Sequence, residues 1–245
     1  MVMKDISNYN KALLTQGFIV LNEIYTAEEL EQLISVIDVA DQSGDTFRKT
    51  DDLFAIRQFL KEIPAVLPVI FNKKLTQLII ELFVDEYFVS KSIYFDKPQK
   101  SNWFVAWHRD LTISVNKKLV LPGFTNWTVK QNQFAVQPPL DILKANFTIR
   151  IHLDDTDKDN GALKVIPGSH LDQEFNAESP FKEAEVICDV KAGGVMIMRP
   201  LLMHASNRTV NDQRRRVLHI EFSNATLPEE IDWSERIDIG SLAKT

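Results

Sequence analysis

The chain has 245 residues, of which 44% are hydrophobic and 25% charged, an ordinary composition for a globular protein long enough to bury a large core. Its formal net charge of −6 gives no reason to expect nucleic acid or an anionic membrane surface as a partner. The only cysteine, Cys188, excludes an internal disulfide and a cysteine-based zinc site, and it fits a reducing, cytoplasmic compartment. Because the first residues carry charges and no stretch of about 18 apolar residues occurs, we expect neither export nor membrane insertion.

The first third of the chain predicts one short strand, over residues 17–21, and then helices. Thr26 and Glu29 form a capping box, and a hydrophobic stripe at helical spacing follows them. Residues 51–60 and 73–83 predict two more helices, separated by prolines. We interpret these helices as packing elements. Arg57 is an exception, because a cation inside an otherwise apolar helix could reach a carboxylate.

From about residue 87 onward the pattern changes to strand-like runs separated by turns. The ranges that predict strands are 88–95, 102–115, 146–154, 163–166, 185–190, 195–199 and 214–222. Residues 116–140 are expected to be irregular, and this length, together with Trp127, favours a lid or binding loop. Helices followed by strands without β–α alternation predict an α+β fold.

The core of this fold is expected to be a double-stranded β-helix, a cupin-like jelly roll, with the N-terminal helices packed against it. We see no repeats and no linker, so the sequence predicts a single domain over residues 1–245. It would consist of a helical front end over about 1–86, a jelly-roll core over about 87–223 and a C-terminal tail over 224–245.

The motif Trp107-His108-Arg109-Asp110 lies within one of the predicted strands. Side chains two residues apart on a strand point to the same face, so His108 and Asp110 could bind one divalent cation. One further histidine would complete a facial triad of two histidines and one carboxylate. Taken alone the motif is weak, because a histidine and an aspartate at this spacing are more often a surface pair or a hydrogen-bonded structural pair.

His204 is the best candidate for the second histidine. It follows a predicted strand and precedes Arg215 on the next one, and a jelly roll brings its early and late strands together. The other three histidines, His152, His170 and His219, are interpreted as structural or solvated imidazoles.

Three motifs, in this order, resemble the phytanoyl-CoA dioxygenase family of Fe(II)- and 2-oxoglutarate-dependent oxygenases. They are residues 107–110 (WHRD), residues 154–170 (DDTDKDNGALKVIPGSH), and His204-Ala205-Ser206 with Arg215-Arg216. The resemblance covers roughly residues 88–222 and a compatible helical front end.

The resemblance implies that His108, Asp110 and His204 bind Fe(II). It also implies that Arg215 pairs with the distal carboxylate of 2-oxoglutarate and that Ser206 donates a hydrogen bond to the same group. Three protein ligands leave room on iron for a chelating 2-oxo acid and for O₂. A planar guanidinium can hold a carboxylate through two parallel hydrogen bonds. Strand alternation leaves open whether Arg215 or its two neighbours face the site, and the resemblance selects Arg215.

Three further positions are weaker expectations. Arg150 falls beside the cosubstrate, where the family often has an aromatic residue, and Arg57 and Trp127 are expected to line the substrate site. Arg109 stands where the family frequently has glutamine, and it could instead form a salt bridge with the acidic segment 154–160. Asp110 occupies the position that a halide needs in halogenating relatives, so hydroxylation or a related oxidation is favoured over halogenation.

These observations predict an enzyme that oxidises a small organic substrate and releases succinate and CO₂. One alternative is a non-catalytic jelly-roll binding module that keeps a structural metal. Another is a zinc or manganese isomerase or hydrolase, which would leave Arg215 without a role. The identity of the substrate, the type of product (hydroxylated, desaturated or cyclised) and the oligomeric state remain open, and no dense basic patch for a CoA phosphate is visible.

Overall fold

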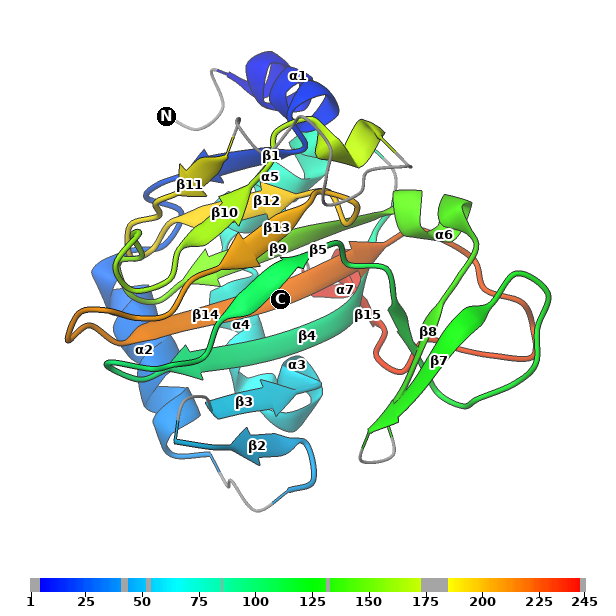
Figure 1. The fold of residues 1–245 in the computed structure, drawn as a ribbon, viewed down its shortest axis with the longest axis horizontal. Helices are drawn as coiled ribbons and strands as arrows, with labels where there is room; N and C mark the ends of the chain where they lie inside the picture. The colour runs from blue at the N-terminus through cyan, green and yellow to red at the C-terminus, as the bar shows by residue number, and fades with distance from the viewer. Residues whose placement is uncertain are drawn as a thin grey trace.

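The computed structural model describes residues 5–40, 44–51, 54–84, 86–130, 133–172 and 185–242. Within these ranges the main body consists of two facing antiparallel sheets, and a third, smaller sheet projects to one side (Figure 1). This arrangement is the predicted α+β jelly roll. The expectation that residues 1–245 form one domain stays a prediction.

The large sheet has the strand order β1-β12-β9-β14-β4-β3-β2, with β15 paired to β4. Its strands are β1 (Phe18–Leu21), β2 (Phe47–Lys49), β3 (Phe54–Arg57), β4 (Phe88–Lys97), β9 (Asn146–His152), β12 (Val195–Met198), β14 (Arg215–Ser223) and β15 (Ile237–Asp238). The facing sheet has the order β11-β10-β13-β5. Its strands are β5 (Val105–His108), β10 (Leu163–Val165), β11 (Val186–Cys188) and β13 (His204–Ser206).

Helices cover the outer face of the large sheet (Figure 1). They are α1 (Ile6–Thr15), α2 (Ala27–Asp38), α3 (Phe59–Glu62), α4 (Leu67–Ile70), α5 (Lys73–Leu82) and α7 (Ile239–Leu242). Helix α6 (Leu140–Lys144) packs instead in a second hydrophobic cluster beside the third sheet. The main hydrophobic core lies between α2, α5 and this face, where Phe83, Phe147 and Phe222 stack on one another. Every helix in the described ranges is too short or too polar to span a bilayer.

The N-terminus of α2 confirms the predicted capping box. The Thr26 hydroxyl accepts a hydrogen bond from the backbone N–H of Glu29 at 3.2 Å, and the Glu29 carboxylate accepts one from the backbone N–H of Thr26 at 2.8 Å. Two backbone donors that have no partner within the helix are thereby satisfied. The helix then buries Leu30, Leu33 and Ile37 against the core.

Thr26→Ala is expected to lower the free energy of unfolding by about 1 kcal/mol, because it leaves the backbone N–H of Glu29 without its cap. Urea denaturation monitored by circular dichroism would measure the change. Ser35→Ala, at an exposed position in the middle of the same helix, is the control and is expected to change stability by less than about 0.5 kcal/mol. Equal stability of Thr26→Ala and the wild type would contradict the role of the capping box.

The predicted helix over residues 51–60 is wrong. Residues 54–57 form β3, which pairs with both β2 and β4, and only the short helix α3 follows, after Gln58 at φ 51°. Alternation on β3 directs Ile56 into the core and Ala55 toward the opposite face. Pairing with a long neighbouring strand therefore overrides the local apolar pattern.

The predicted single strand over residues 102–115 is two strands in different sheets. The first is β5, which pairs with β13, and the second is β6 (Ile113–Val115), which pairs with β8. The connection between them bends at Asp110, whose backbone N–H donates to the carbonyl of Pro200 at 3.0 Å. His108 and Asp110 therefore do not share one face of a continuous strand, and the bend brings them together instead.

The expectation of an irregular segment over residues 116–140 is also wrong. This segment contains β7 (Thr125–Lys130) and β8 (Gln133–Gln137), which form the small third sheet with β6 in the order β6-β8-β7. Trp127 on β7 packs against a second hydrophobic cluster that includes Phe88, Val136 and Trp233. Strands β7 and β8 are thus a packed pair, held to the body by apolar contacts.

Candidate active site

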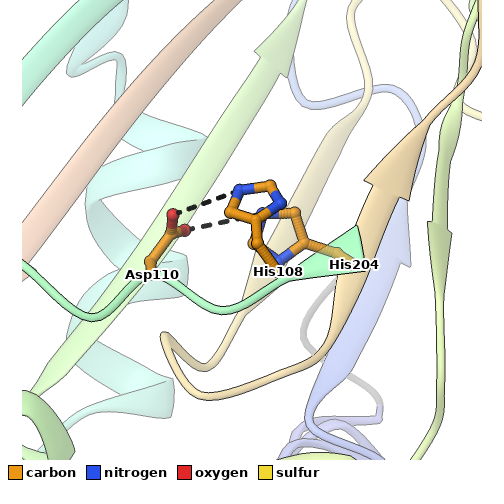
Figure 2. Close-up of side chains that lie close together, drawn as sticks. All are labelled: His108, Asp110 and His204. Carbon is orange, nitrogen blue, oxygen red and sulfur yellow. Dashed lines mark ion pairs between the residues drawn. The ribbon is translucent and has the colours of Figure 1, made fainter. Parts of the chain in front are cut away.

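Three side chains from two distant parts of the chain meet on the inner side of the facing sheet (Figure 2). His204 on β13 lies directly opposite His108 on β5, and the centroids of their rings are 4.2 Å apart. Asp110 reaches both from the bend that follows β5. Its Oδ1 lies 3.8 Å from His108 Nε2, and its Oδ2 lies 3.7 Å from His204 Nε2.

The orientation of both imidazoles leaves the same nitrogen available to a cation. His108 Nδ1 donates to the carbonyl of Ala106 at 2.8 Å, and His204 Nδ1 donates to the carbonyl of Leu202 at 2.9 Å. Because a carbonyl can only accept, each Nδ1 carries the proton and each Nε2 presents its lone pair. Of the described residues, none forms a hydrogen bond to the buried Oδ2 of Asp110.

One ligating atom from each of the three residues lies within 4.8 Å of the others. Two imidazole nitrogens and a carboxylate oxygen are the donor set of non-haem Fe(II) facial triads. The residues present therefore fit a divalent transition metal.

The protonation states of Asp110 and His204 also suit a metal. Burial would raise the pKa of Asp110, but the neighbouring His204, His219 and Lys91 outweigh burial and lower the pKa to about 2. Burial lowers the pKa of His204 to about 4, against the opposing effect of Asp110. At neutral pH the aspartate is therefore ionised and His204 is neutral, as metal ligation requires.

A cavity of about 200 Å³ lies beside the three side chains, between the two sheets. It is lined by His108, Asp110 and His204, by four further polar or charged residues of the large sheet (Lys91, Arg150, Arg215 and His219), by Ser206, and by Ile93, Phe95, Trp103, Val105 and Leu163. The predicted site residues Arg150, Ser206 and Arg215 thus share one cavity with the three candidate ligands. Arg57 and Trp127 do not line it.

Two buried arginines stand in this cavity without a carboxylate partner among the described residues. Arg215 donates through Nη1 to the carbonyl of Gly161 and, at 3.4 Å, to the hydroxyl of Ser206. Burial and the charge of Arg150 lower the pKa of Arg215 to about 9, and burial lowers the pKa of Arg150 to about 10. Both guanidinium groups still carry their charge at neutral pH, so the cavity is prepared for an anion.

The hydroxyl of Ser206, which the sequence predicts to bind the cosubstrate, already has a hydrogen-bond acceptor within the protein. Its hydroxyl donates to the carbonyl of Gly161 at 2.9 Å. Gly161 has a φ of +87°, and a Cβ at this position would lie 2.8 Å from the backbone oxygen of Asn207. Glycine therefore allows the chain to approach Ser206 and Arg215 closely.

A hydrogen-bonded network of buried side chains forms the floor of the cavity. Arg150 Nη1 lies 2.9 Å from His219 Nδ1, His219 Nε2 lies 3.1 Å from Glu221 Oε1, and Lys91 Nζ lies 2.7 Å from the same oxygen. Since arginine only donates, His219 Nδ1 accepts and His219 Nε2–H donates to Glu221. Sequence reasoning passed over Lys91 and treated His219 as structural. The alternation of Lys91, Ile93 and Phe95 on β4 was the available signal.

The neighbouring arginines are paired elsewhere. Arg214 forms an ion pair with Asp96, and Arg216 forms one with Asp154 at 2.7 Å. The sequence predicts a salt bridge between Arg109 and the acidic segment 154–160. In the structure, Arg109 Nη2 donates to the backbone carbonyls of Ser169 and Asp172.

The other two histidines form hydrogen bonds outside the residues that line the cavity. His152 Nδ1 lies 2.8 Å from the Thr156 hydroxyl, and His170 Nε2 lies 3.2 Å from the carbonyl of Leu14. Cys188 is buried, and burial raises the pKa of its thiol to about 12, so the thiol is protonated and unreactive at neutral pH.

The chain is similar to a protein family, to a curated relative and to several solved structures. A curated relative, "Uncharacterized protein Rv1501" of Mycobacterium tuberculosis, is 27% identical over 114 residues. The match spans 46% of this chain and 42% of that protein, so it covers less than half of either sequence.

Two solved structures share the fold. EctD from S. alaskensis, crystallised with 2-oxoglutarate and 5-hydroxyectoine, superposes with a TM-score of 0.68 at 22% identity, over 89% of this chain and 75% of EctD. The epimerase SnoN from nogalamycin biosynthesis, crystallised with Fe³⁺, alpha ketoglutarate and nogalamycin RO, superposes with a TM-score of 0.67 at 13% identity, over 90% of this chain and 84% of SnoN. These similarities confirm the jelly-roll fold.

The family model "Phytanoyl-CoA dioxygenase (PhyH)" matches residues 13–217, which includes all three candidate metal ligands, both cavity arginines and most of the helical front end. This match spans most of the chain and confirms the resemblance that the three motifs carried. The chain belongs to the phytanoyl-CoA dioxygenase family.

Proposed function

We propose that this protein is an Fe(II)- and 2-oxoglutarate-dependent oxygenase that hydroxylates or otherwise oxidises a small organic molecule. The observation that carries the proposal is the convergence of His108, Asp110 and His204 beside two buried arginines without carboxylate partners in the described ranges. Such a cavity fits a cation and a dianionic cosubstrate at once.

The roles of the side chains follow from their chemistry. His108 and His204 would hold the metal through Nε2, and the hydrogen bonds from Nδ1 to Ala106 and Leu202 keep both rings in that orientation. Asp110 would supply the third ligand. Fe(II) bound there would supply free coordination positions for a 2-oxo acid and O₂, together with the oxidation chemistry that converts 2-oxoglutarate into succinate and CO₂.

Arg215 would bind the distal carboxylate of 2-oxoglutarate. Its guanidinium is buried, fixed by the carbonyl of Gly161, and separated by strand alternation from the paired Arg214 and Arg216. An ionised carboxylate in this position satisfies a buried charge that otherwise costs free energy. Ser206 lies beside it and would donate a hydrogen bond to the same carboxylate after turning away from Gly161.

The relatives support a small-molecule substrate. EctD was crystallised with 5-hydroxyectoine and SnoN with nogalamycin RO, which are both small molecules. Because Asp110 fills the position of the third ligand, hydroxylation or a related oxidation is favoured over halogenation.

The test is a titration of the Fe(II)-loaded protein with 2-oxoglutarate in the absence of oxygen. We expect a visible absorption band that depends on both components and that is missing when Zn(II) replaces Fe(II). Admission of oxygen should then produce succinate. If the wild type binds iron but shows neither band nor succinate, the non-catalytic binding module is the correct interpretation. That module also predicts that chelators destabilise the protein, whereas Arg215→Ala leaves its stability unchanged.

A further inference from the structure

A second hollow adjoins the candidate active site on the side of β3. Arg57, Gln58, Gln133, Ser114 and Glu235 line it, and it shares Lys91 and Ile93 with the cavity that holds the three candidate ligands. On β3 and β4, opposite residues lie on the same face, so Arg57 is next to Ile93 and Ala55 is next to Phe95. The hollow is therefore an extension of the same inner face of the large sheet.

The part of the main cavity next to Ile93, which both hollows share with Lys91, is apolar. Ala55, Ile93, Phe95 and Trp103 form a separate hydrophobic cluster, in which the rings of Phe95 and Trp103 stack with centroids 6.0 Å apart. An organic molecule that extends from the candidate metal centre toward β3 would lie along this cluster and would end at Arg57. The cluster thus provides an apolar surface for the body of a substrate, with a cation at the far end.

Arg57 is half-buried and has no ion pair within the described part of the chain. Burial lowers its pKa, and the positive charge of Arg48 on the adjacent strand lowers it further, so its surroundings disfavour the cation. Glu235 in the same hollow does not fully compensate, because its carboxylate oxygens bind Ser92, at 2.6 and 2.7 Å, and burial raises its pKa to about 7. The guanidinium is left with unused donors that face the hollow.

A second unused donor points to the same kind of ligand. The buried side-chain Nε2 of Gln133 on β8 has no hydrogen-bond partner among the described residues, and Gln133 lines the hollow with Arg57. A buried donor without an acceptor costs about 1–3 kcal/mol. The hollow has a volume of about 20 Å³, which admits only the end of a ligand, and a carboxylate that enters it would lie beside both side chains.

The charges of the main cavity also favour an anionic ligand. Among the described residues, Lys91, Arg150 and Arg215 supply three positive charges there, and Asp110 and Glu221 supply two negative ones. Fe(II) and the 2-oxoglutarate dianion add no net charge, so a positive charge remains after both are bound. This charge favours the entry of an anionic substrate, whose carboxylate would then bind at Arg57.

We propose that the substrate is a small organic acid whose carboxylate binds Arg57 and Gln133, while its apolar body lies on the cluster of Ala55, Ile93, Phe95 and Trp103. This assignment rests on the proposed oxygenase function and names the class of substrate for that site. Arg57 then selects acids over neutral analogues and fixes which end of the molecule faces the metal.

The test uses a matched pair of probes, 4-fluorophenylacetate and 4-fluorophenylacetamide, which differ in charge but hardly in size. Binding is measured by ¹⁹F NMR titration of the protein loaded with Zn(II) and saturated with 2-oxoglutarate, so that Arg215 is occupied and no turnover occurs. We expect the acid to bind at least about tenfold more tightly than the amide. Arg57→Gln should remove this preference, and Arg57→Lys should retain part of it.

Arg48→Gln is the matched control, because it removes a positive charge from an exposed residue that influences Arg57 but does not line the hollow. It should weaken binding of the acid by less than about twofold. The proposal is overturned if acid and amide bind equally, if neither binds, if Arg57→Gln keeps the preference, or if Arg48→Gln has as large an effect as Arg57→Gln.

A failure of the substrate assignment can be distinguished from a failure of the proposed oxygenase function. Arg57 lies outside the cavity that holds Arg215 and the candidate ligands, so Arg57→Gln should retain the band formed by Fe(II) and 2-oxoglutarate. A normal band without a preference for the acid refutes the substrate assignment alone. A preference for the acid that depends on Arg57 in a protein without the band refutes the oxygenase proposal alone.

Discussion

His204→Gln is expected to weaken Fe(II) binding by more than about a hundredfold and to abolish consumption of 2-oxoglutarate. Loss of a hydrogen bond to a metal-bound histidine already costs about 10- to 100-fold in metal affinity, and removal of the ligand itself should cost more. His204 is buried on β13 and lies opposite His108, so glutamine preserves the strand while removing the imidazole nitrogen. Iron content after anaerobic loading and desalting, together with the turnover rate, measures the effect.

The control is His170→Gln. His170 forms a hydrogen bond to the carbonyl of Leu14 and lies outside the cavity, so its replacement should leave iron content and turnover within about twofold of the wild type. Circular dichroism of both variants verifies that the strands persist. Wild-type iron content and turnover in His204→Gln would show that His204 is not a metal ligand.

Arg215→Lys is expected to raise the dissociation constant for 2-oxoglutarate by roughly 30-fold to several thousand-fold, equivalent to about 2–5 kcal/mol for a disrupted buried charge pair. Lysine keeps the charge but cannot offer two parallel donors to a carboxylate. It also loses the contact of Arg215 Nη1 with the carbonyl of Gly161, which orients the guanidinium. Anaerobic titration of the Fe(II)-dependent band gives the dissociation constant directly.

Arg214→Lys provides the comparison at the adjacent position. Arg214 points away from the cavity and pairs with Asp96, so this variant should bind 2-oxoglutarate within about twofold of the wild type. A dissociation constant that is unchanged in Arg215→Lys, or that rises equally in Arg214→Lys, would assign the cosubstrate carboxylate to a different residue. Arg150, which shares the cavity, would then be the first candidate.

Elements with strong local signals were predictable from the sequence. The capping box at Thr26 and the apolar stripe of α5 depend on contacts within one helix, so their residues specify them locally. On strand β9, Phe147, Ile149 and Ile151 point toward the helices, and Arg150 points toward the cavity. This two-residue alternation of apolar and polar side chains was visible in the sequence.

The failures share one cause. Residues 54–57 form a strand because β4 offers an edge to pair with, and β7 and β8 form paired strands because β6 and a hydrophobic cluster hold them. The same applies to the bend at Asp110, which depends on the carbonyl of Pro200. Long-range pairing is invisible to a local pattern, so these elements could not be recognised from their own residues.

The sequence alone determined the family, the jelly-roll fold and the identity of the candidate ligands, since these depend on residue types in a specific order. Only the tertiary structure decided which side chains share a cavity. It placed Lys91 and His219 beside the predicted residues, packed Trp127 in a hydrophobic cluster outside the cavity, and placed Arg57 on a strand next to Ile93 rather than in a helix. The reason is physical: ligation and charge pairing depend on distances of a few ångströms between strands that are remote along the chain, and packing of the sheets sets those distances.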